Sequence, residues 1–465
     1  MFFNIFIILL YIVLYIFRSG VLMRFYRRIE EVQVFDKPGK YILYWMQGAF
    51  RTRYNHSLEF AKYLSNEHLL PLMVLVIVDF SYPEGNFRSF KFFLEGLKDV
   101  YDELICQQIG INIVIGRFQD VLRSYIDNSK IMVTDKSYLP TLKNIKNAIY
   151  DENKITVYQV DTNLILPVSI ASPKKEYSAH TIRPKILKHL EEYLNDFEEV
   201  RYKNKFLNSK TEINLAKIEN ELKKQNLIFV PSAPYIGGYK DSKKKLYNFI
   251  NEKFENYAKR NNHLNMNVES DLSPYLHFGN ISPIEILNEL KKVKVNVENY
   301  YSFQEELVIR RELAHNFTYY SNDLTNLENL LPSWAIKTLY DHKEDKREYV
   351  YSLEEFEDGK THDEIWNAAQ RELKNRGKIH SYIRMYWGKK IIEWSKTIEE
   401  AYKNMTYLNN KYAIDGRDPN SYAGILWCFG LHDRAFKERE IFGKVRWMSE
   451  KSLVRKFDLN KYIKN

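Results

Sequence analysis

The sequence predicts an α/β domain, a linker and a larger all-α domain, and two observations support this fold class. Short apolar runs alternate with amphipathic helical segments over residues 41–160, the pattern of a doubly wound parallel sheet. From Leu227 onward the periodicity is helical and strand signals are few. The chain has 465 residues, enough for two or three domains, and its 45% hydrophobic and 28% charged composition excludes wholesale disorder. The predicted divisions are 1–22 (apolar extension), 23–165 (α/β domain), 166–225 (linker) and 226–465 (helical domain).

Five apolar runs predict the strands of the α/β domain. Several are continuously apolar, as expected of strands covered on both faces. Helical patterns lie between them, for example from Asn55 to Leu64, so we expect right-handed crossovers and any ligand at the carboxyl ends of the strands. Neither G-x-G-x-x-G nor a P-loop motif is present. The predicted strands are Tyr41–Met46, Leu72–Asp79, Ile111–Ile115, Ile131–Thr134 and Ile155–Val160.

The segment after the last predicted strand loses this alternation. It carries Pro167, Pro173 and Pro184 and then charged helical stretches, which is typical of a connector between domains.

The N-terminus is apolar. Residues 1–17 contain one polar side chain, Asn4, and arginines follow from Arg18. A membrane helix needs about 17–25 residues, so a membrane tether is one interpretation. We favour the other, in which translation begins at Met23 and the protein is cytoplasmic.

Charge and cysteine content narrow the function classes. Lys+Arg number 69 and Asp+Glu 60, a formal net charge of +9. Ten bases and four acids fall between Arg434 and Asn465, and an acid-rich stretch spans residues 341–372, which indicates a polarised surface that could hold phosphates. Two cysteines, Cys106 and Cys428, exclude a disulfide framework and a four-cysteine zinc site, and no metal is expected.

Two helix starts in the helical domain suggest an anion site. Ser273-Pro274 and Ser282-Pro283 each combine a side-chain cap with proline at the first helical position. Neighbouring helix N-termini present free N–H groups and positive dipole ends, which suit phosphates. Simple helix punctuation is the alternative.

A tryptophan-rich stripe and a charged neighbour form a second candidate region. Trp387 and Trp394 share one face of a predicted helix with Ile383 and Ile391, and core packing is the commonest role of such residues. Arg384 lies beside this stripe and requires a partner.

Asp415 is the candidate partner. It belongs to residues 409–420, which are rich in turn formers and carboxamides and predict a polar loop, either a site wall or a surface turn. Residues 422–436 then place aromatic side chains beside His432, Asp433 and Arg434, a mixture that proteins use to hold unpaired bases.

Read together, six segments resemble class II cyclobutane pyrimidine dimer photolyases of the photolyase/cryptochrome family. The resemblance runs in order from about Tyr41 to the C-terminus, and residues 44–51 are similar to that family's first strand and turn. The six segments are Leu272-Ser-Pro-Tyr-Leu-His-Phe-Gly279, residues 305–317, Thr361-His-Asp-Glu-Ile-Trp366, Arg384-Met-Tyr-Trp387, Asp415-Gly-Arg-Asp-Pro-Asn420 and His432-Asp-Arg434.

This resemblance implies a deoxyribodipyrimidine photo-lyase, a lyase that repairs UV-damaged DNA in light through a buried, reduced FAD. It also implies a monomer associated with DNA, and an α/β domain that could hold an antenna chromophore (a deazaflavin, a folate or a second flavin). A cryptochrome-type photoreceptor that keeps FAD without repair is the alternative, and a membrane-tethered flavoprotein a third.

The resemblance also assigns roles to residues around the cofactor. Arg384 and Asp415 would form an ion pair beside the isoalloxazine, and Asn409 would face the flavin N5. Trp387, Trp366 and Trp394 would carry electrons from the surface. The FAD phosphate and ribose region would be lined by Tyr257, Ser273, Leu276, His277, Phe278 and Gly279, with Arg311 nearby.

The same resemblance implies a substrate site. Glu306 would contact the lesion bases, Met385 and Trp427 would pack against the flipped dimer, and Arg434 would brace the gap left in the DNA.

Overall fold

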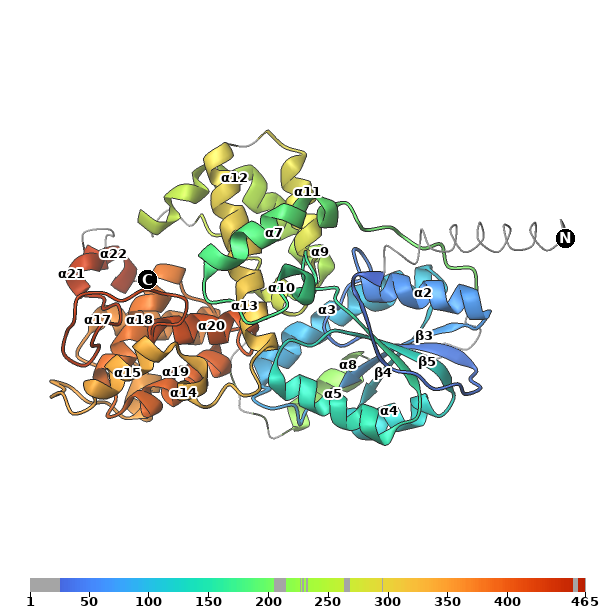
Figure 1. Ribbon diagram of the computed structural model, residues 1–465, viewed down its shortest axis with the longest axis horizontal. Helices are drawn as coiled ribbons and strands as arrows, with labels where there is room; N and C mark the ends of the chain where they lie inside the picture. Colours follow the sequence, from blue (N-terminus) through green and yellow to red (C-terminus); the bar gives the residue numbers. More distant parts are fainter. Residues whose placement is uncertain are drawn as a thin grey trace, which may run out of the picture.

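The computed structural model describes residues 26–204, 215–225, 227, 230, 233–262, 268–294, 296–454 and 459–464. Figure 1 shows two parts of the molecule: the sheet with its covering helices at the right, and an assembly of helices toward the left. The apolar run 1–17 and Met23 lie outside the described residues. Within the described ranges no helix is both long and apolar enough to cross a membrane.

Six strands form one sheet in the order β1-β6-β5-β2-β3-β4. Strands β2 to β6 are mutually parallel, as predicted, and each begins or ends within two residues of its predicted bounds. β1 was not predicted: it pairs antiparallel with β6 at the sheet edge, and its charged, half-exposed sequence IEEVQ lacks an apolar run. The strands are β1 (Ile29–Gln33), β2 (Tyr41–Trp45), β3 (Leu72–Val78), β4 (Gly110–Ile115), β5 (Ser129–Asp135) and β6 (Thr156–Val160).

Successive side chains of each strand point to opposite faces of the sheet. Apolar side chains lie on both faces, so helices cover both. In β2, Ile42 and Tyr44 join a core with α2, α3 and α8, whereas Leu43 and Trp45 join one with α4 and α5. α2 begins after Asn55, whose side chain accepts the N–H of Leu58 at 3.0 Å. The helices are α2 (His56–His68), α3 (Phe87–Cys106), α4 (Phe118–Ile126), α5 (Pro140–Glu152) and α8 (Leu215–Lys224).

The predicted connector contains two further helices, α6 (Val168–Ala171) and α7 (Ala179–Leu194), before α8. Glu312 of the helical domain holds this segment, because its Oε1 accepts the N–H groups of Ile165 and Leu166 at 2.9 and 3.1 Å. Burial raises the pKa of Glu312 to about 8.

The remaining described elements are helices, and the residues that they bury form two cores. α12, the π-helical turn η4 and α13 follow one another without a break, and such π segments are frequent at functional sites. The elements are α9 (Tyr239–Asn248), η1 (Phe249–Lys253), η2 (Phe254–Asn262), α10 (Ser273–His277), α11 (Pro283–Lys291), α12 (Val297–Gln304), η4 (Glu305–Arg310), α13 (Arg311–Tyr319), α14 (Leu327–Leu330), α15 (Ser333–Asp341), α16 (Leu353–Asp358), α17 (Glu364–Arg376), α18 (Ser381–Trp394), α19 (Ile398–Tyr412), α20 (Pro419–Cys428), α21 (Glu450–Val454) and α22 (Leu459–Lys464).

The prediction that Ser273 caps a helix is wrong. Ser273 is the first residue of α10, and Leu272 before it provides no side-chain cap. α10 has five residues, so little dipole accumulates at its start. Ser282 does cap α11, but it is fully buried, so the second helix start faces protein rather than a ligand.

The two domains approach each other closely at Gly48 and Gly279. Gly279 has φ +64°, and a Cβ there would lie 2.2 Å from the Gly48 carbonyl oxygen. We therefore expect Gly279→Ala to lower the free energy of unfolding by about 3 kcal/mol, from left-handed strain and overpacking.

Gly424 in α20 is the matched control, since an added Cβ would meet no heavy atom within 4 Å outside its own helix. Gly424→Ala should leave stability within about 1 kcal/mol of the parent. Urea unfolding followed by circular dichroism measures both variants, and equal effects would contradict the close-contact explanation.

Candidate functional site

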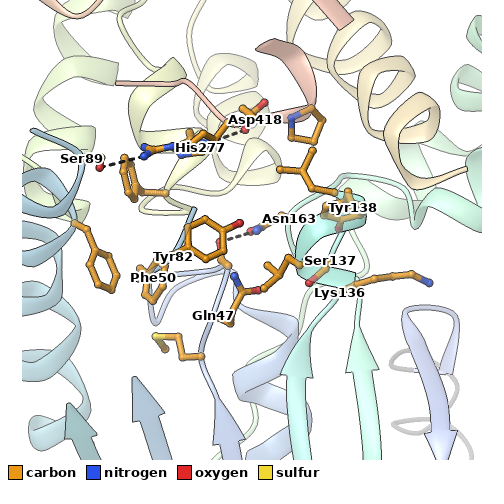
Figure 2. A pocket seen from close by; sticks show the side chains of 18 of the residues that line it. Gln47, Phe50, Tyr82, Ser89, Lys136, Ser137, Tyr138, Asn163, His277 and Asp418 are labelled. Atoms are coloured by element: carbon orange, nitrogen blue, oxygen red, sulfur yellow. Dashed lines mark hydrogen bonds and ion pairs between the residues drawn. The ribbon is translucent and has the colours of Figure 1, made fainter. Parts of the chain in front are cut away.

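A cavity opens at the carboxyl ends of the parallel strands, where the sequence predicts a ligand. Its empty volume is about 1200 Å³. Figure 2 shows Gln47, Lys136 and Ser137 at the strand ends, with His277 and Asp418 on the opposite side. Because the helical domain contributes these last two residues, the space lies between the domains and is here named the interdomain cavity.

Aromatic and polar side chains both line the interdomain cavity. Asp79 accepts the N–H of Phe118 at 3.1 Å, and Asn163 donates to the Gly48 carbonyl at 2.6 Å. This mixture suits a planar ring system oriented by a few polar contacts. The aromatic lining residues are Trp45, Phe50, Tyr82, Phe90, Phe93, Phe118, Tyr138 and Phe278.

A second cavity lies within the helical domain. A pocket of about 740 Å³ empty volume and a broader groove of about 2000 Å³ share much of their lining, so they form one helical cleft. The residues common to both are Tyr257, Ser270, Leu272, Ser273, Glu306, Arg384, Asp415 and Asn420.

The structure gathers most of the predicted cofactor and substrate residues around this helical cleft. Phe278 lines the interdomain cavity instead, Gly279 and Asn409 line neither cavity, and Arg434 is exposed with its guanidinium 5.3 Å from the Phe436 ring. The predicted residues in the cleft are Tyr257, Ser273, Leu276, His277, Glu306, Arg311, Arg384, Met385, Asp415 and Trp427.

Arg384 and Asp415 approach each other across the cleft. Arg384 Nη2 lies 3.7 Å from Asp415 Oδ1, which is an ion pair but too long for a good hydrogen bond. This Oδ1 is buried and has no hydrogen-bond partner among the described residues. A buried carboxylate oxygen of this kind is suited to accept an N–H from a ligand.

Four residues line both cavities and form a shared wall: Leu276, His277, Arg311 and Asp418. His277 Nδ1 lies 3.0 Å from Asp418 Oδ2, and Asp418 Oδ1 accepts the N–H of Asn420 at 2.8 Å, which caps α20. Burial opposes ionisation of Asp418, but the His277 hydrogen bond and nearby positive charge hold its pKa far below the usual range. Sequence reasoning missed Asp418, although Asp418-Pro419 is itself a helix-start pattern.

The prediction of a polar loop over residues 409–420 is wrong in its first part, because residues up to Tyr412 complete α19. Asn409 is buried there, and its Nδ2 donates to Asn410 Oδ1 at 3.4 Å. Asn410 Nδ2 in turn donates to Glu84 Oε2 at 2.8 Å, which links this helix end to the α/β domain.

The three predicted tryptophans are in contact. The ring centroids of Trp366 and Trp387 lie 6.3 Å apart, with 5° between the ring planes. The ring centroids of Trp366 and Trp394 lie 6.2 Å apart, with 66° between the planes. Trp366 Nε1 donates to the Trp387 carbonyl at 2.9 Å, and Trp387 Nε1 donates to Gln370 Oε1 at 3.0 Å. All three are buried in the helical core, so they are core residues and a continuous aromatic array at once.

The fold and the two cavities define a two-domain protein whose helical domain carries a ligand-binding cleft. A family model described as DNA photolyase matches residues 42–202. A deoxyribodipyrimidine photo-lyase of Methanothermobacter thermautotrophicus is 41% identical over 92% of this chain and 95% of its own length. One of Arabidopsis thaliana is 35% identical over 93% of this chain and 90% of its own. The chain belongs to the DNA photolyase family.

Solved structures confirm the fold class. A cryptochrome of Synechocystis sp. PCC6803 matches with a TM-score of 0.69 at 15% identity, over 93% of this chain and 89% of that one. An archaeal photolyase from Sulfolobus tokodaii matches with a TM-score of 0.63 at 17% identity, over 84% of this chain and 83% of that one. Likeness at these identities concerns the fold alone.

Removing the charge of Asp418 should weaken the shared wall. Asp418→Asn keeps an oxygen to cap α20 but loses the buried negative charge that faces His277 and Arg311, so we expect about 3 kcal/mol less stability in urea unfolding at neutral pH. Asp341→Asn, at an exposed ion pair with Lys337, is the control and should cost less than about 1 kcal/mol. Equal losses would show that the wall does not depend on this charge.

Proposed function

We propose that this chain is a light-driven DNA repair enzyme of the class II cyclobutane pyrimidine dimer photolyase type. One observation carries the proposal: a deep pocket beside the Arg384–Asp415 pair opens into a groove bearing Glu306, Met385 and Trp427. A cofactor and a flipped pyrimidine dimer can therefore occupy one continuous cleft. The relatives named deoxyribodipyrimidine photo-lyase, 35–41% identical over 90% or more of this chain, support this function.

The helical cleft fits FAD. Asp415 Oδ1, buried and without a hydrogen bond in the described structure, can accept an N–H of the flavin ring, and Arg384 would hold that carboxylate in place. Bound there in its reduced form, FAD would supply the chemistry of the repair reaction, an electron donated from its light-excited state to the lesion. The phosphate and ribose part would be held by Tyr257, Ser273, Leu276, His277 and Arg311.

Three predicted cofactor residues act from outside the cleft in this proposal. Phe278 and Gly279 fix the preceding Leu276 and His277 by packing against the α/β domain. Asn409, oriented through Asn410, would present its carboxamide to the flavin N5.

The open end of the cleft would receive the lesion. Two cations flank the Trp427 ring, with Lys389 Nζ at 5.4 Å and the Arg446 guanidinium at 5.2 Å, which fixes the ring as a stacking surface. Glu306 on the η4 turn would hydrogen-bond the pyrimidine edge. Exposed Arg434 would brace the gap from which the dimer is flipped, and the enzyme would act as a monomer.

The interdomain cavity would hold a second, light-harvesting chromophore. Its aromatic lining suits a deazaflavin, a folate or a flavin, and the shared wall keeps its occupant adjacent to the helical cleft. The Sulfolobus tokodaii photolyase is described with two FAD molecules, which supports a cavity of this kind in the family.

The repair function predicts light-dependent turnover. Purified chain beginning at Met23 should bind FAD and restore an oligonucleotide containing a thymine dimer under blue light only. Chromatography of the oligonucleotide before and after illumination measures the product. Equal restoration in darkness, or protein without flavin, would refute the function, and a bound flavin without repair would favour the cryptochrome alternative.

The tryptophan array predicts a separable effect. Trp387→Phe should slow photoreduction of oxidised FAD by more than about 10-fold while repair by chemically pre-reduced enzyme stays largely intact, because the array recharges the cofactor but does not touch the lesion. Trp334→Phe, outside the array and hydrogen-bonded to Tyr177, is the control. Flavin absorbance under illumination reports the rate, and unchanged photoreduction in Trp387→Phe would contradict the assignment.

A further inference from the structure

The aromatic array continues beyond Trp394 onto side chains that the sequence prediction did not include. The centroid of the Tyr351 ring lies 5.7 Å from that of Trp394, with 78° between the ring planes. The centroid of the His362 ring lies 4.9 Å from that of Trp394. The Tyr351 N–H also donates to the Trp394 carbonyl at 3.0 Å, so backbone and ring together hold Tyr351 against the end of α18.

Hydrogen bonds at Tyr351 define where its proton points. Its hydroxyl oxygen accepts the backbone N–H of His362 at 3.0 Å and lies 2.7 Å from His362 Nδ1. The oxygen has two lone pairs and one hydrogen of its own, so it can accept the His362 N–H and still donate its hydrogen to Nδ1. In that arrangement the imidazole proton is on Nε2.

We propose that His362 is the base that takes the phenolic proton of Tyr351 when an electron leaves this tyrosine for Trp394. The Trp394 radical cation gains one electron and returns to neutral tryptophan. Tyr351 loses that electron and its O–H proton, the proton forms an N–H bond at His362 Nδ1, and a neutral tyrosyl radical remains. An external thiol then restores the phenol by giving a hydrogen atom, which leaves a thiyl radical, and the imidazolium releases its extra proton to water.

The position of His362 suits this role. A phenol that loses an electron becomes strongly acidic, so a hydrogen-bonded base lowers the barrier to its oxidation. His362 is itself exposed, and its ring stacks on Tyr349 at 3.7 Å and 20°, which holds the imidazole in place while leaving a path to solvent. The inference rests on the proposed electron path through the tryptophans.

The test uses FAD-loaded chain with oxidised flavin, excited by a light pulse, with dithiothreitol as the thiol. Transient absorption follows decay of the tryptophan radical, and electron paramagnetic resonance identifies the radical that persists. In the parent protein we expect a neutral tyrosyl radical and slower transfer in D₂O. Tyr351→Phe should leave only a tryptophan radical.

His362→Ala should slow formation of the tyrosyl radical by about 100-fold, and added imidazole should restore much of the rate because the site is exposed. Tyr349→Phe, which keeps the stack but has no bond to Tyr351, is the matched control and should behave as the parent. His362→Phe, which keeps an aromatic ring, should be slow and not respond to imidazole. Circular dichroism and flavin absorbance report folding.

Parental rates in His362→Ala and His362→Phe would overturn the proposal, as would a slow His362→Ala that imidazole does not restore, since that result assigns His362 to packing. A failure of the proposed tryptophan path gives a different result from a failure of the role of His362. If the path does not run through Trp387, the tryptophan and tyrosyl radicals would form in Trp387→Phe as they do in the parent protein.

Discussion

The buried guanidinium of Arg51 is the interaction on which the joining of the two domains depends. Its side chain is 1% exposed, and burial lowers its pKa only to about 10, so it stays charged at neutral pH. Nη1 donates to the Gly279 carbonyl at 2.9 Å, and Nη2 donates to the Thr162 carbonyl at 2.7 Å. A charge buried this deeply must keep its hydrogen bonds, so the turn at Gly279 cannot move away from the sheet without a large cost.

Asp135 provides the other half of this constraint. At the end of β5 its Oδ2 accepts three successive backbone N–H groups, those of Gln47, Gly48 and Ala49, at 2.7–3.0 Å. The turn that carries Arg51 is therefore fixed relative to the strands, and Gly279 is fixed relative to that turn. His277 precedes this contact by two residues, so the shared wall between the cavities is a consequence of how the domains are joined.

Local pattern was sufficient to predict the parallel strands, because each is a short, mainly apolar run between helical segments. It could not predict β1, whose sequence IEEVQ has two adjacent glutamates and no apolar run, and which pairs with β6 at the sheet edge. The segment 409–420 was misread for a related reason. Asn409 and Asn410 favour loops by composition, but burial and the long-range bond from Asn410 to Glu84 retain them in α19.

The site shows the same division. Motif residues were predicted because their order along the chain is characteristic, whereas Asp418, Asn163 and His362 act through partners more than ten residues away or through loop geometry that no periodicity reveals. Glu306 is an intermediate case. The motif predicted that Glu306 is a site residue, but it did not predict the π-helical turn on which Glu306 lies.

Core packing and electron transfer are compatible roles for the tryptophans. Close packing brings Trp387, Trp366 and Trp394 into contact for stability alone, and the indole N–H groups of Trp366 and Trp387 are satisfied within the core. What distinguishes this array from an ordinary core is its end, where the apolar run gives way to an exposed hydroxyl–imidazole pair at Tyr351 and His362. A stability requirement alone would favour an apolar residue against Trp394. A polar, proton-accepting terminus is what a path carrying positive charge outward would need, because only there can the charge leave as a proton.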